Sequence, residues 1–369
     1  MKKILAMLLI AVMVFSIAAC GSKEGPKDTE KTGGETQGAD TKVMDDLFDL
    51  AKYKSSKDKS EWTIAVVTKD NTAAWFKRME EGVNKFKEET GINVIQKGPA
   101  NADAMSQVQV VDDMINQGVD ALVVIPIDPG ALEESLKKAM EQGIVVVTHE
   151  ASNQKNTLFD VEAFTSKDFG CSIMDTLAKE MGEKGKYAVM VAYTTSTTHM
   201  EYANAELERQ LEKYPDMELV NNGEVPSAES EESMDTSYER AKEILKANPD
   251  LAGFTGHAST DLPGIAKAVE ELGLQGKVKL VGVTTPNEVK DYIDNGTITA
   301  LKLWDPASSG YASVSVAAKI LAGEEVGEGT DLGIDGYNKV QFLADGPCRL
   351  LIGQADITID ATNRSEYNF

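Results

Sequence analysis

Short apolar runs alternate with amphipathic segments along the chain from Trp62 onward. Each run is bounded by Gly, Pro, Asn or Asp, as β-strands commonly are. In the segments between the runs, apolar residues recur at spacings of three and four, and several of these segments end at a glycine. That pattern predicts an amphipathic helix followed by its C-cap. The expected strands are Thr63–Thr68, Ile92–Gln96, Ala121–Ile125, Ile144–Thr148, Tyr187–Ala192, Glu218–Asn221, Leu251–Thr255 and Lys279–Val283.

This alternation predicts the fold class. The first helical segment places Phe76, Met79 and Val83 on one face and stops at Gly91. Strands that alternate with helices of this length form right-handed βαβ units around a parallel sheet. The continuous apolar run 121–125 fits a sheet that is covered on both faces. We therefore expect an α/β protein with doubly wound parallel sheets.

The N-terminal segment has the pattern of a secretory signal. Lys2 and Lys3 precede an apolar stretch over residues 4–17, and small residues stand directly before Cys20. The placement of Cys20 resembles the bacterial lipobox, in which the thiol is lipidated and becomes the new N-terminus. The alternative, an uncleaved membrane helix, would need roughly twenty apolar residues. We expect residues 1–19 to be a lipoprotein signal peptide and the working part to be extracytoplasmic and lipid-anchored to the cell membrane.

Residues 20–60 are expected to form the lipidated cysteine and a flexible stalk. Residues 21–42 are rich in Gly, Lys, Thr and Glu and contain almost no apolar side chain. Such a segment cannot bury enough surface to offset its ordering entropy. Farther along, Val43, Leu47 and Leu50 suggest a short helix that packs on the first domain.

Charge and cysteine content narrow the function classes. After residues 1–19 are removed, the chain carries 35 basic and 60 acidic side chains. This balance argues against nucleic acid as a partner, because such binding relies on neutralising phosphates. Cys171 and Cys348 could pair, but one pair is no disulfide framework. The chain contains no CxxC, HExxH, GxSxG or GxxxxGK[ST] motif, and we expect a non-enzymatic protein with no cofactor and no bound metal.

Polar and aromatic residues gather just after the expected strands. In an open parallel sheet, ligands bind beyond the carboxyl ends of the strands, so these residues are the candidate ligand-binding set. All three histidines of the chain follow strands. Trp75 lies off the apolar stripe of its helix and is the better stacking candidate, whereas Phe76 fits the stripe. The set comprises Lys69, Asp70, Trp75, Phe76, His149, Glu150, His199, Glu201, His257, Asp261, Trp304 and Asp305.

This mixture of side chains suits a polar, hydroxylated small molecule. Carboxylates, lysine and imidazoles hydrogen-bond to hydroxyl groups, and flat aromatic faces cover the C–H faces of a ring. Hydrogen bonds to charged groups contribute about 1.5–3 kcal/mol each. A handful of them with aromatic burial reaches the roughly −8 kcal/mol of a micromolar site.

The order of these motifs resembles the type I periplasmic solute-binding proteins of ABC importers, closest to the branch that holds autoinducer-2-binding and rhamnose-binding proteins. The resemblance runs from about residue 62 to residue 369. Each motif alone is weak, and the ordered set is what carries the resemblance. The motifs are Ile64-Ala65-Val66-Val67-Thr68-Lys69, Trp75-Phe76, Lys97-Gly98-Pro99-Ala100, Gln107-Val108-Gln109, Thr148-His149-Glu150, Gly282-Val283-Thr284-Thr285-Pro286-Asn287, Leu303-Trp304-Asp305-Pro306 and Glu366-Tyr367-Asn368-Phe369.

The resemblance implies two lobes joined by a three-segment hinge, closing on a ligand. Residues 61–163 and 306–340 would form the N-terminal lobe, and residues 164–305 and 341–369 the C-terminal lobe. The chain would cross near 161–165, at Trp304-Asp305-Pro306 and near 340. Trp304 and Asp305 would then lie at the hinge and form the floor of the cleft.

The ligand shell of the autoinducer-2 receptors is only half present. Lys69 matches the lysine that they use on their ligand, and Glu150 stands where they have an aspartate. Their next Asp-Gln pair falls on His199-Met200, and the Pro and Ala of their second lobe fall near His257 and Ser259. The resemblance therefore implies a sugar or related polyol rather than autoinducer-2.

These observations favour non-catalytic capture of a sugar-like solute, which the protein, expected to be a monomer, would deliver to an ABC permease. A ligand shifts lobe closure only by its differential affinity for the closed state. Three alternatives stay open at this point. They are an autoinducer-2 receptor of the same fold, a metal-binding protein that uses the three histidines with Glu150, and a sensor subunit that signals to a chemoreceptor or kinase.

Overall fold

The computed structural model describes residues 47–344 and 346–369. The expected signal peptide, Cys20 and the polar segment that follows lie outside the described residues. Within the described ranges, none of the helices combines the length and apolar character that crossing a membrane requires.

The first sheet has seven strands in the order β12-β13-β5-β4-β3-β1-β2. Its central strands β1, β3 and β4 are apolar and buried except for a threonine at one end of β1 and of β4, as the sequence predicted for a sheet covered on both faces. The pairings among β13, β5, β4, β3, β1 and β2 are parallel, and β12 is antiparallel to β13. The strands are β1 Thr63–Val67, β2 Asn93–Lys97, β3 Ala121–Val124, β4 Val145–Thr148, β5 Phe159–Glu162, β12 Gln341–Leu343 and β13 Leu350–Ile352.

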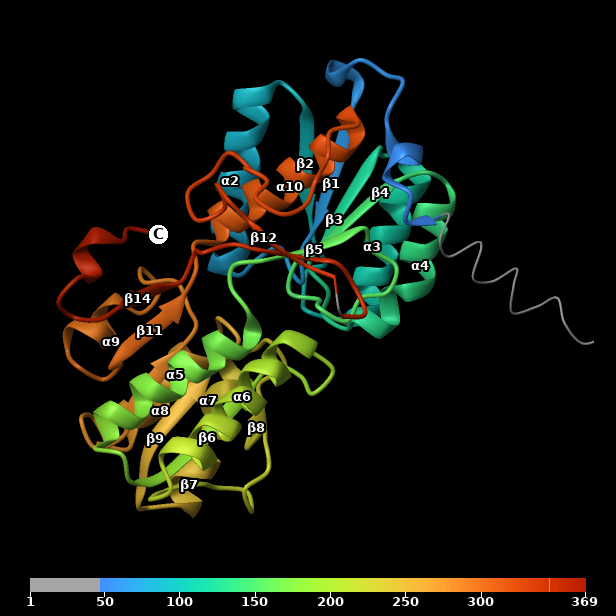
Figure 1. Cartoon of the computed structure of the whole chain (residues 1–369). Helices are drawn as coiled ribbons and strands as arrows, with labels where there is room; N and C mark the ends of the chain where they lie inside the picture. The colour runs from blue at the N-terminus through green and yellow to red at the C-terminus, as the bar shows by residue number, and fades with distance from the viewer. Residues whose placement is uncertain (1–46, 345) are drawn as a thin grey trace, which may run out of the picture. The chain divides into compact units, whose positions relative to one another are not determined.

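Four helices cover this sheet and complete the first lobe. Figure 1 shows α2 (Ala74–Thr90) and α10 (Pro306–Ala322) side by side on one face, with α3 (Ala104–Gln117) and α4 (Pro129–Glu141) on the other. The expected stop of α2 at Gly91 is confirmed, because Gly91 is its C-cap in the left-handed conformation with φ 74°.

Helices α2 and α10 approach so closely that a side chain at Gly82 would not fit. A Cβ atom at Gly82 would lie 1.8 Å from the carbonyl oxygen of Ala307, which is backbone and cannot move aside alone. We expect Gly82→Ala to lower the free energy of unfolding by about 3 kcal/mol, the upper range for overpacking. Urea unfolding followed by circular dichroism measures this. Asn84→Ala, at an exposed position of the same helix, is the control and should change stability by less than about 0.5 kcal/mol.

The second sheet forms the second lobe and follows the order β14-β11-β10-β9-β6-β7, with β8 also paired to β6. It is parallel except for β14 on β11. Helices α5 and α6 pack together, as do α7 and α8, and α9 is a short helix before β11. The elements are α5 Ser166–Met181, β6 Gly185–Val191, α6 Thr197–Lys213, β7 Met217–Leu219, β8 Ala228–Glu229, α7 Met234–Ala247, β9 Leu251–Gly256, α8 Asp261–Glu271, β10 Lys279–Gly282, α9 Lys290–Asp294, β11 Ala300–Leu303 and β14 Ile357–Ile359.

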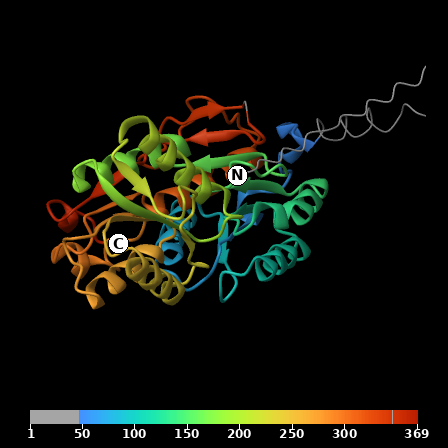
Figure 2. The ribbon, with the colours of Figure 1, turned by 90° about the horizontal axis from the view of Figure 1, so that it is seen from below.

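Three segments connect the two lobes, at residues 163–165, 304–305 and 353–356. The sequence placed the third crossing near 340 and assigned residues 341–369 to the second lobe. The sheet pairings differ, because β13 pairs in parallel with β5 and β12 extends that edge. Figure 2 shows these red strands beside the green β5. Residues 341–352 thus belong to the first sheet, and the third crossing follows them.

Residues 47–60 pack on the first lobe. Val43 of the expected helix lies outside the described residues, and the described part of this segment forms two short 3₁₀ turns, Leu50–Tyr53 and Lys59–Glu61. Ser55 donates its backbone N–H to the carbonyl oxygen of Leu321 at 2.8 Å, and Lys57 forms an ion pair with Asp120 at 2.6 Å. The part of the expected stalk that the structure describes is therefore attached to the fold.

Candidate functional site

The carboxyl ends of strands from both sheets meet around one cavity, which we call the interlobe cavity. Each of these strands is followed by a loop or the first turn of a helix that contributes a side chain to the lining, so the parallel topology brings residues distant in sequence together. The first lobe contributes residues after β1 and β4, and the second contributes residues after β6, β8, β9, β10 and β11. The cavity is lined by Lys69, Trp75, Phe76, Glu150, His199, Glu232, His257, Ala258, Ser259, Val283 and Trp304.

An ion-pair triad lies at the centre of this cavity. The Nζ atom of Lys69 is 2.7 Å from Oε2 of Glu150, in the same lobe, and 3.6 Å from Oε1 of Glu232, in the other lobe. The three side chains are only 5–6% exposed. Lys69 therefore neutralises one buried carboxylate at hydrogen-bond distance and reaches a second across the lobe boundary.

The pKa values of the triad follow from burial and mutual charge. Burial works against the charged form of Lys69, but the two carboxylates outweigh it and raise its pKa. Burial would likewise raise the pKa of Glu150, but Lys69 and then His149 hold it below its usual value. For Glu232, burial dominates over the attraction of the more distant Lys69, and its pKa is raised to about 7.

This raised pKa gives a stability prediction for Glu232. In the unfolded chain the carboxyl group titrates near 4.5, so between about pH 4.5 and 7 the folded state holds a proton that the unfolded state has lost. The stability that Glu232 contributes is fully present below its unfolded-state pKa of 4.5 and is lost as the pH rises through its folded-state pKa of about 7. We expect the stability of the wild type relative to Glu232→Gln to fall by about 3 kcal/mol across that window. Urea unfolding of both proteins at a series of pH values measures it; parallel curves would contradict the assignment.

Two neutral imidazoles line the second-lobe side of the interlobe cavity. Burial lowers the pKa of His199 well below its usual value, and it lowers that of His257 to about 3. The backbone N–H of Ala192 donates to Nδ1 of His199 at 3.4 Å, which leaves Nε2 as the proton-bearing nitrogen. Nδ1 of His257 has no hydrogen-bond partner among the described residues. Both rings can exchange hydrogen bonds with a ligand without adding charge.

Trp304 occupies the hinge beside this cavity and joins the aromatic residues of both lobes. Its ring lies edge-on to those of Trp75 at 4.9 Å, Phe164 at 5.3 Å and Phe169 at 5.9 Å between centroids. The indole Nε1 of Trp304 is buried and finds no acceptor within the part of the chain that is described. A buried donor of this kind normally has a partner, so Nε1 of Trp304 is able to donate to an acceptor on a bound molecule.

The structure brings seven of the twelve predicted ligand residues to the interlobe cavity, namely Lys69, Trp75, Phe76, Glu150, His199, His257 and Trp304. Trp75 and Phe76 both line it, although the sequence favoured Phe76 as a core residue. Whether each of these residues touches a ligand stays a prediction.

The other five predicted residues do not line the interlobe cavity, and each already has a role in the fold. Asp70 accepts hydrogen bonds from the backbone N–H groups of Thr72 and Ala73, each at 2.7 Å, and Asp261 accepts from those of His257 and Ala258, each at 2.9 Å. Nδ1 of His149 lies 2.5 Å from the carbonyl oxygen of Val161, and Ser152 donates to Glu201 at 2.5 Å. Asp305 lies beside a different cavity.

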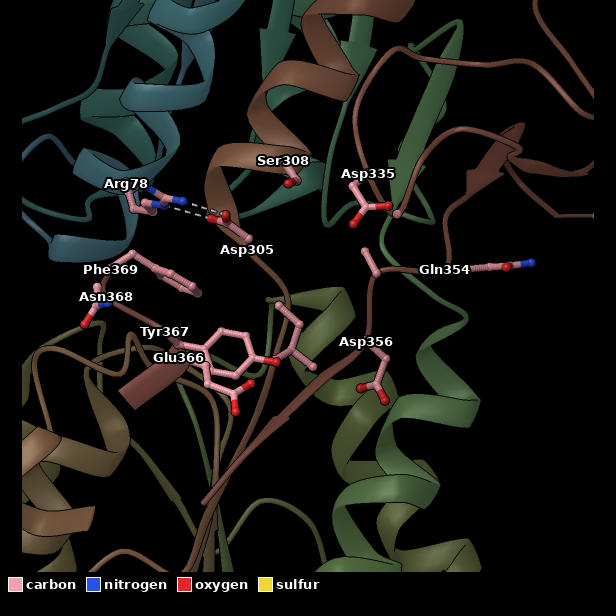
Figure 3. A pocket seen from close by; sticks show the side chains of 13 residues that line it. Arg78, Asp305, Ser308, Asp335, Gln354, Asp356, Glu366, Tyr367, Asn368 and Phe369 are labelled. Atoms are coloured by element: carbon pink, nitrogen blue, oxygen red, sulfur yellow. Dashed lines mark hydrogen bonds and ion pairs between the residues drawn. The ribbon is translucent and has the colours of Figure 1, made fainter. Parts of the chain in front are cut away.

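That second cavity, which we call the hinge cavity, has a volume of ≈ 530 Å³ and is walled partly by the C-terminal residues. Figure 3 shows Asp305 paired with the Arg78 guanidinium, whose Nε and Nη2 donate to the two carboxylate oxygens at 2.9 and 2.7 Å. The guanidinium carbon of Arg78 also lies 4.8 Å from the ring centroid of Phe369. The backbone N–H of Asn287 donates to the carbonyl oxygen of Phe369 at 2.9 Å. The C-terminal segment thus links the second lobe to α2 of the first.

Glu232 is the charged cavity residue that sequence reasoning missed. It follows β8, a strand of two residues in a polar loop without an apolar period, so no strand was expected there. The available signal was the acidic run Glu229-Ser230-Glu231-Glu232 lying between a strand and a helix. Ser259 was noted only for its position in the resemblance and Val283 only as a member of a strand and a motif, and Ala258 was not singled out.

The free space inside the interlobe cavity is ≈ 20 Å³, which is room for about one water molecule. A sugar of about ten non-hydrogen atoms needs several times the ≈ 30 Å³ share of one water in the liquid. The lobes must therefore separate for a sugar to enter, and the link between Lys69 and Glu232 must lengthen. Other contacts across the lobe boundary have to break as well, including Tyr193 Oη donating to the carbonyl oxygen of Ala102 at 3.1 Å.

The described residues form neither a cluster of metal ligands nor a disulfide between Cys171 and Cys348. No group of three or more His, Cys, Asp or Glu side chains within the described ranges is placed to hold a metal ion. The proposed set of three histidines therefore has no common centre. Cys171 and Cys348 are separate free thiols in the structure, and Cys348 is buried.

Comparison with known proteins identifies similar sequences and folds. A family model described as "Periplasmic binding protein domain" matches residues 64–325. The D-ribose/D-allose-binding protein of Pseudomonas aeruginosa is 26% identical over 280 residues, which is 71% of this chain and 82% of that protein. The xylitol-binding protein of Mycolicibacterium smegmatis is 22% identical over 261 residues, covering 70% of this chain and 72% of its own length.

Two solved structures share the fold at 25% sequence identity. LsrB from Clostridium saccharobutylicum in complex with AI-2 aligns with a TM-score of 0.75 and covers 83% of this chain and 100% of that chain. An ABC transporter solute-binding protein from Clostridium phytofermentas with bound L-rhamnose aligns with a TM-score of 0.74 and covers 83% and 98%. Both are similar to this chain in the two-lobed α/β architecture.

Proposed function

Because the chain belongs to the periplasmic binding protein family, we propose that it captures a sugar-like small molecule between its two lobes and delivers it to an ABC importer. The observation that carries this proposal is the interlobe cavity, where Lys69 lies between two carboxylates and beside aromatic rings. Small-molecule sites have this composition, a few placed polar groups amid aromatic side chains. The sugar and polyol ligands named for the relatives support the same ligand class.

Unpartnered polar atoms support a hydroxylated ligand in particular. Within residues 47–344 and 346–369, Nε1 of Trp304 finds no acceptor and Nδ1 of His257 finds no partner, and both residues line the cavity. A sugar hydroxyl both donates and accepts, so it can satisfy either atom. The neighbouring Trp75 and Phe76 rings would cover the C–H faces of a pyranose or furanose.

We further propose that the protein is tethered outside the cytoplasm through a lipid on Cys20. The apolar segment and the small residues before Cys20 support this. Acyl chains contribute on the order of 0.8 kcal/mol per buried methylene, so two or three chains would hold the protein on a membrane. Mass spectrometry of the membrane-extracted protein tests the tether, and Cys20→Ala should release it into the soluble fraction.

Direct binding combined with compaction tests the ligand proposal. Calorimetric titration of the full chain with pentoses, hexoses, deoxysugars and autoinducer-2 should give at least one saturable ligand. Small-angle scattering should show a change in the radius of gyration only when that ligand is present, because a ligand shifts the balance between open and closed lobes by its differential affinity for the two states. Absence of binding across the panel would overturn the proposal. Binding of autoinducer-2 alone would instead assign the receptor role.

A further inference from the structure

The interlobe cavity holds more negative than positive charge. Lys69 is the cation that lines it, whereas Glu150 and Glu232 both line it and His199 and His257 are neutral. Lys69 lies closer to Glu150, at 2.7 Å against 3.6 Å for Glu232. One carboxylate is therefore compensated at hydrogen-bond distance and the other is not.

Among the described residues, the groups other than Lys69 with the largest influence on Glu232 add no positive charge. Besides Lys69, the groups that act on Glu232 are Asp261 from the second lobe and Glu150 and Asp70 from the first, and all three oppose its ionisation. With burial they raise the pKa of Glu232 to about 7. A positive group close to this carboxylate would stabilise its ionised form.

The backbone holds Glu232 in an uncommon conformation. Both Glu231 and Glu232 have positive φ, 58° and 52°, a conformation that non-glycine residues adopt in only a few per cent of cases and that is enriched at functional sites. The loop is fixed by hydrogen bonds from the N–H of Ser230 to the carbonyl oxygen of Val191 and from the N–H of Glu231 to that of Ala192. This pair of left-handed residues directs the Glu232 side chain into the cavity, where it is 6% exposed, while Glu231 is exposed.

We propose that Glu232 sets the charge selectivity of the interlobe cavity, so that a sugar-like solute with a protonated amino group binds better than its neutral parent and an acidic derivative is rejected. This inference rests on the proposed function and specifies its ligand class. An ammonium group near Glu232 forms a charge-assisted hydrogen bond and supplies the absent positive charge. Trp75, Phe76 and Trp304 add aromatic faces that also attract cations. A carboxylate or phosphate would instead add a buried charge of the same sign.

Matched sugar derivatives test the selectivity. We would titrate the full chain, in a buffer slightly above neutral pH, with an amino-deoxy sugar, its neutral parent and its uronic acid. Triplets built on glucose, galactose and mannose reduce the dependence on stereochemistry. In the triplet that binds, the amino sugar should bind about tenfold more tightly than the parent, and the uronic acid at least about tenfold more weakly.

Two variants test whether the preference for the amino sugar depends on the carboxylate of Glu232. Glu232→Gln should bring the amino sugar within about threefold of the parent and reduce the penalty on the uronic acid. Glu231→Gln removes the same charge from the exposed neighbouring position and should leave the ranking unchanged. Thermal unfolding of both variants checks that they are folded.

The outcomes separate this inference from the proposed function. If the uronic acid binds as tightly as its parent, if the neutral parent binds and the amino sugar does not, or if Glu232→Gln leaves the ranking intact, the selectivity is wrong while sugar capture stands. If no member of any triplet and no sugar of the wider panel binds, the proposed function falls and the inference falls with it.

Discussion

Replacing Lys69 by methionine is expected to lower the free energy of unfolding by about 3–5 kcal/mol, the cost of breaking a buried ion pair from one side. The change would leave Glu150, 5% exposed, without its partner at 2.7 Å, and Glu232 without its contact across the lobe boundary. Urea unfolding monitored by tryptophan fluorescence measures the loss. Sugar binding should also weaken by at least about a hundredfold, because the charged donor of the cavity is gone.

Two comparisons separate charge pairing from loss of bulk. Lys69→Met/Glu150→Gln removes both partners and should recover most of the lost stability, since the buried carboxylate no longer needs a counter-charge. Lys137→Met removes an ion pair with Glu141 whose side chains are about half exposed, and it should cost less than about 1 kcal/mol. Equal losses in the Lys69 single and double variants would show that the ion pair is not the cause.

Trp304→Ala is expected to cost about 3–5 kcal/mol of stability and to impair ligand binding as well. The side chain is 3% exposed and is in ring contact with Trp75 of the first lobe and Phe169 of the second. Its removal would open a cavity at the crossing point of the chain. Denaturant unfolding and calorimetry with the bound sugar measure the two effects.

Trp62 provides a matched control for this prediction. It is equally buried, at 3% exposure, but it does not line the interlobe cavity. Trp62→Ala should therefore lose comparable stability and keep sugar affinity within about threefold. Trp304→Phe retains a ring and lacks the indole N–H, so it should be the more stable of the two Trp304 variants and still bind less tightly. Unchanged sugar affinity in Trp304→Ala would remove this residue from the site.

Much of the fold was predictable because the strands are short apolar runs and the helices have regular apolar spacing. The same pattern predicted that Lys69, Glu150, His199 and His257 follow strands. In a parallel sheet the carboxyl ends of the strands lie along one edge, so these residues come close together. Prediction failed where the local pattern was weak. Strand β13 is identified by its pairing with β5, far earlier in the chain, and apolar runs do not encode which partner a strand will take.

The site was harder to predict than the fold, for two physical reasons. Asp305 follows a strand as expected, but its carboxylate pairs with Arg78 and caps α10 at the N–H of Ala307, so it faces away from the interlobe cavity. Glu232 reaches that cavity through a left-handed backbone turn. Side-chain direction of this kind depends on backbone angles and on partners from other elements, which a single sequence does not specify.

The first lobe is assembled from two stretches of chain, and this affects the order of folding during synthesis. Helix α10 and strands β12 and β13 are made after the whole run from α5 to β11. A nascent chain that has just completed Leu303 would expose the face of α2 that Gly82 presents to Ala307. The second lobe, needing only β14 from the late segment, can condense before the first is finished. A chaperone that shields the unfinished lobe would act on that exposed helix face.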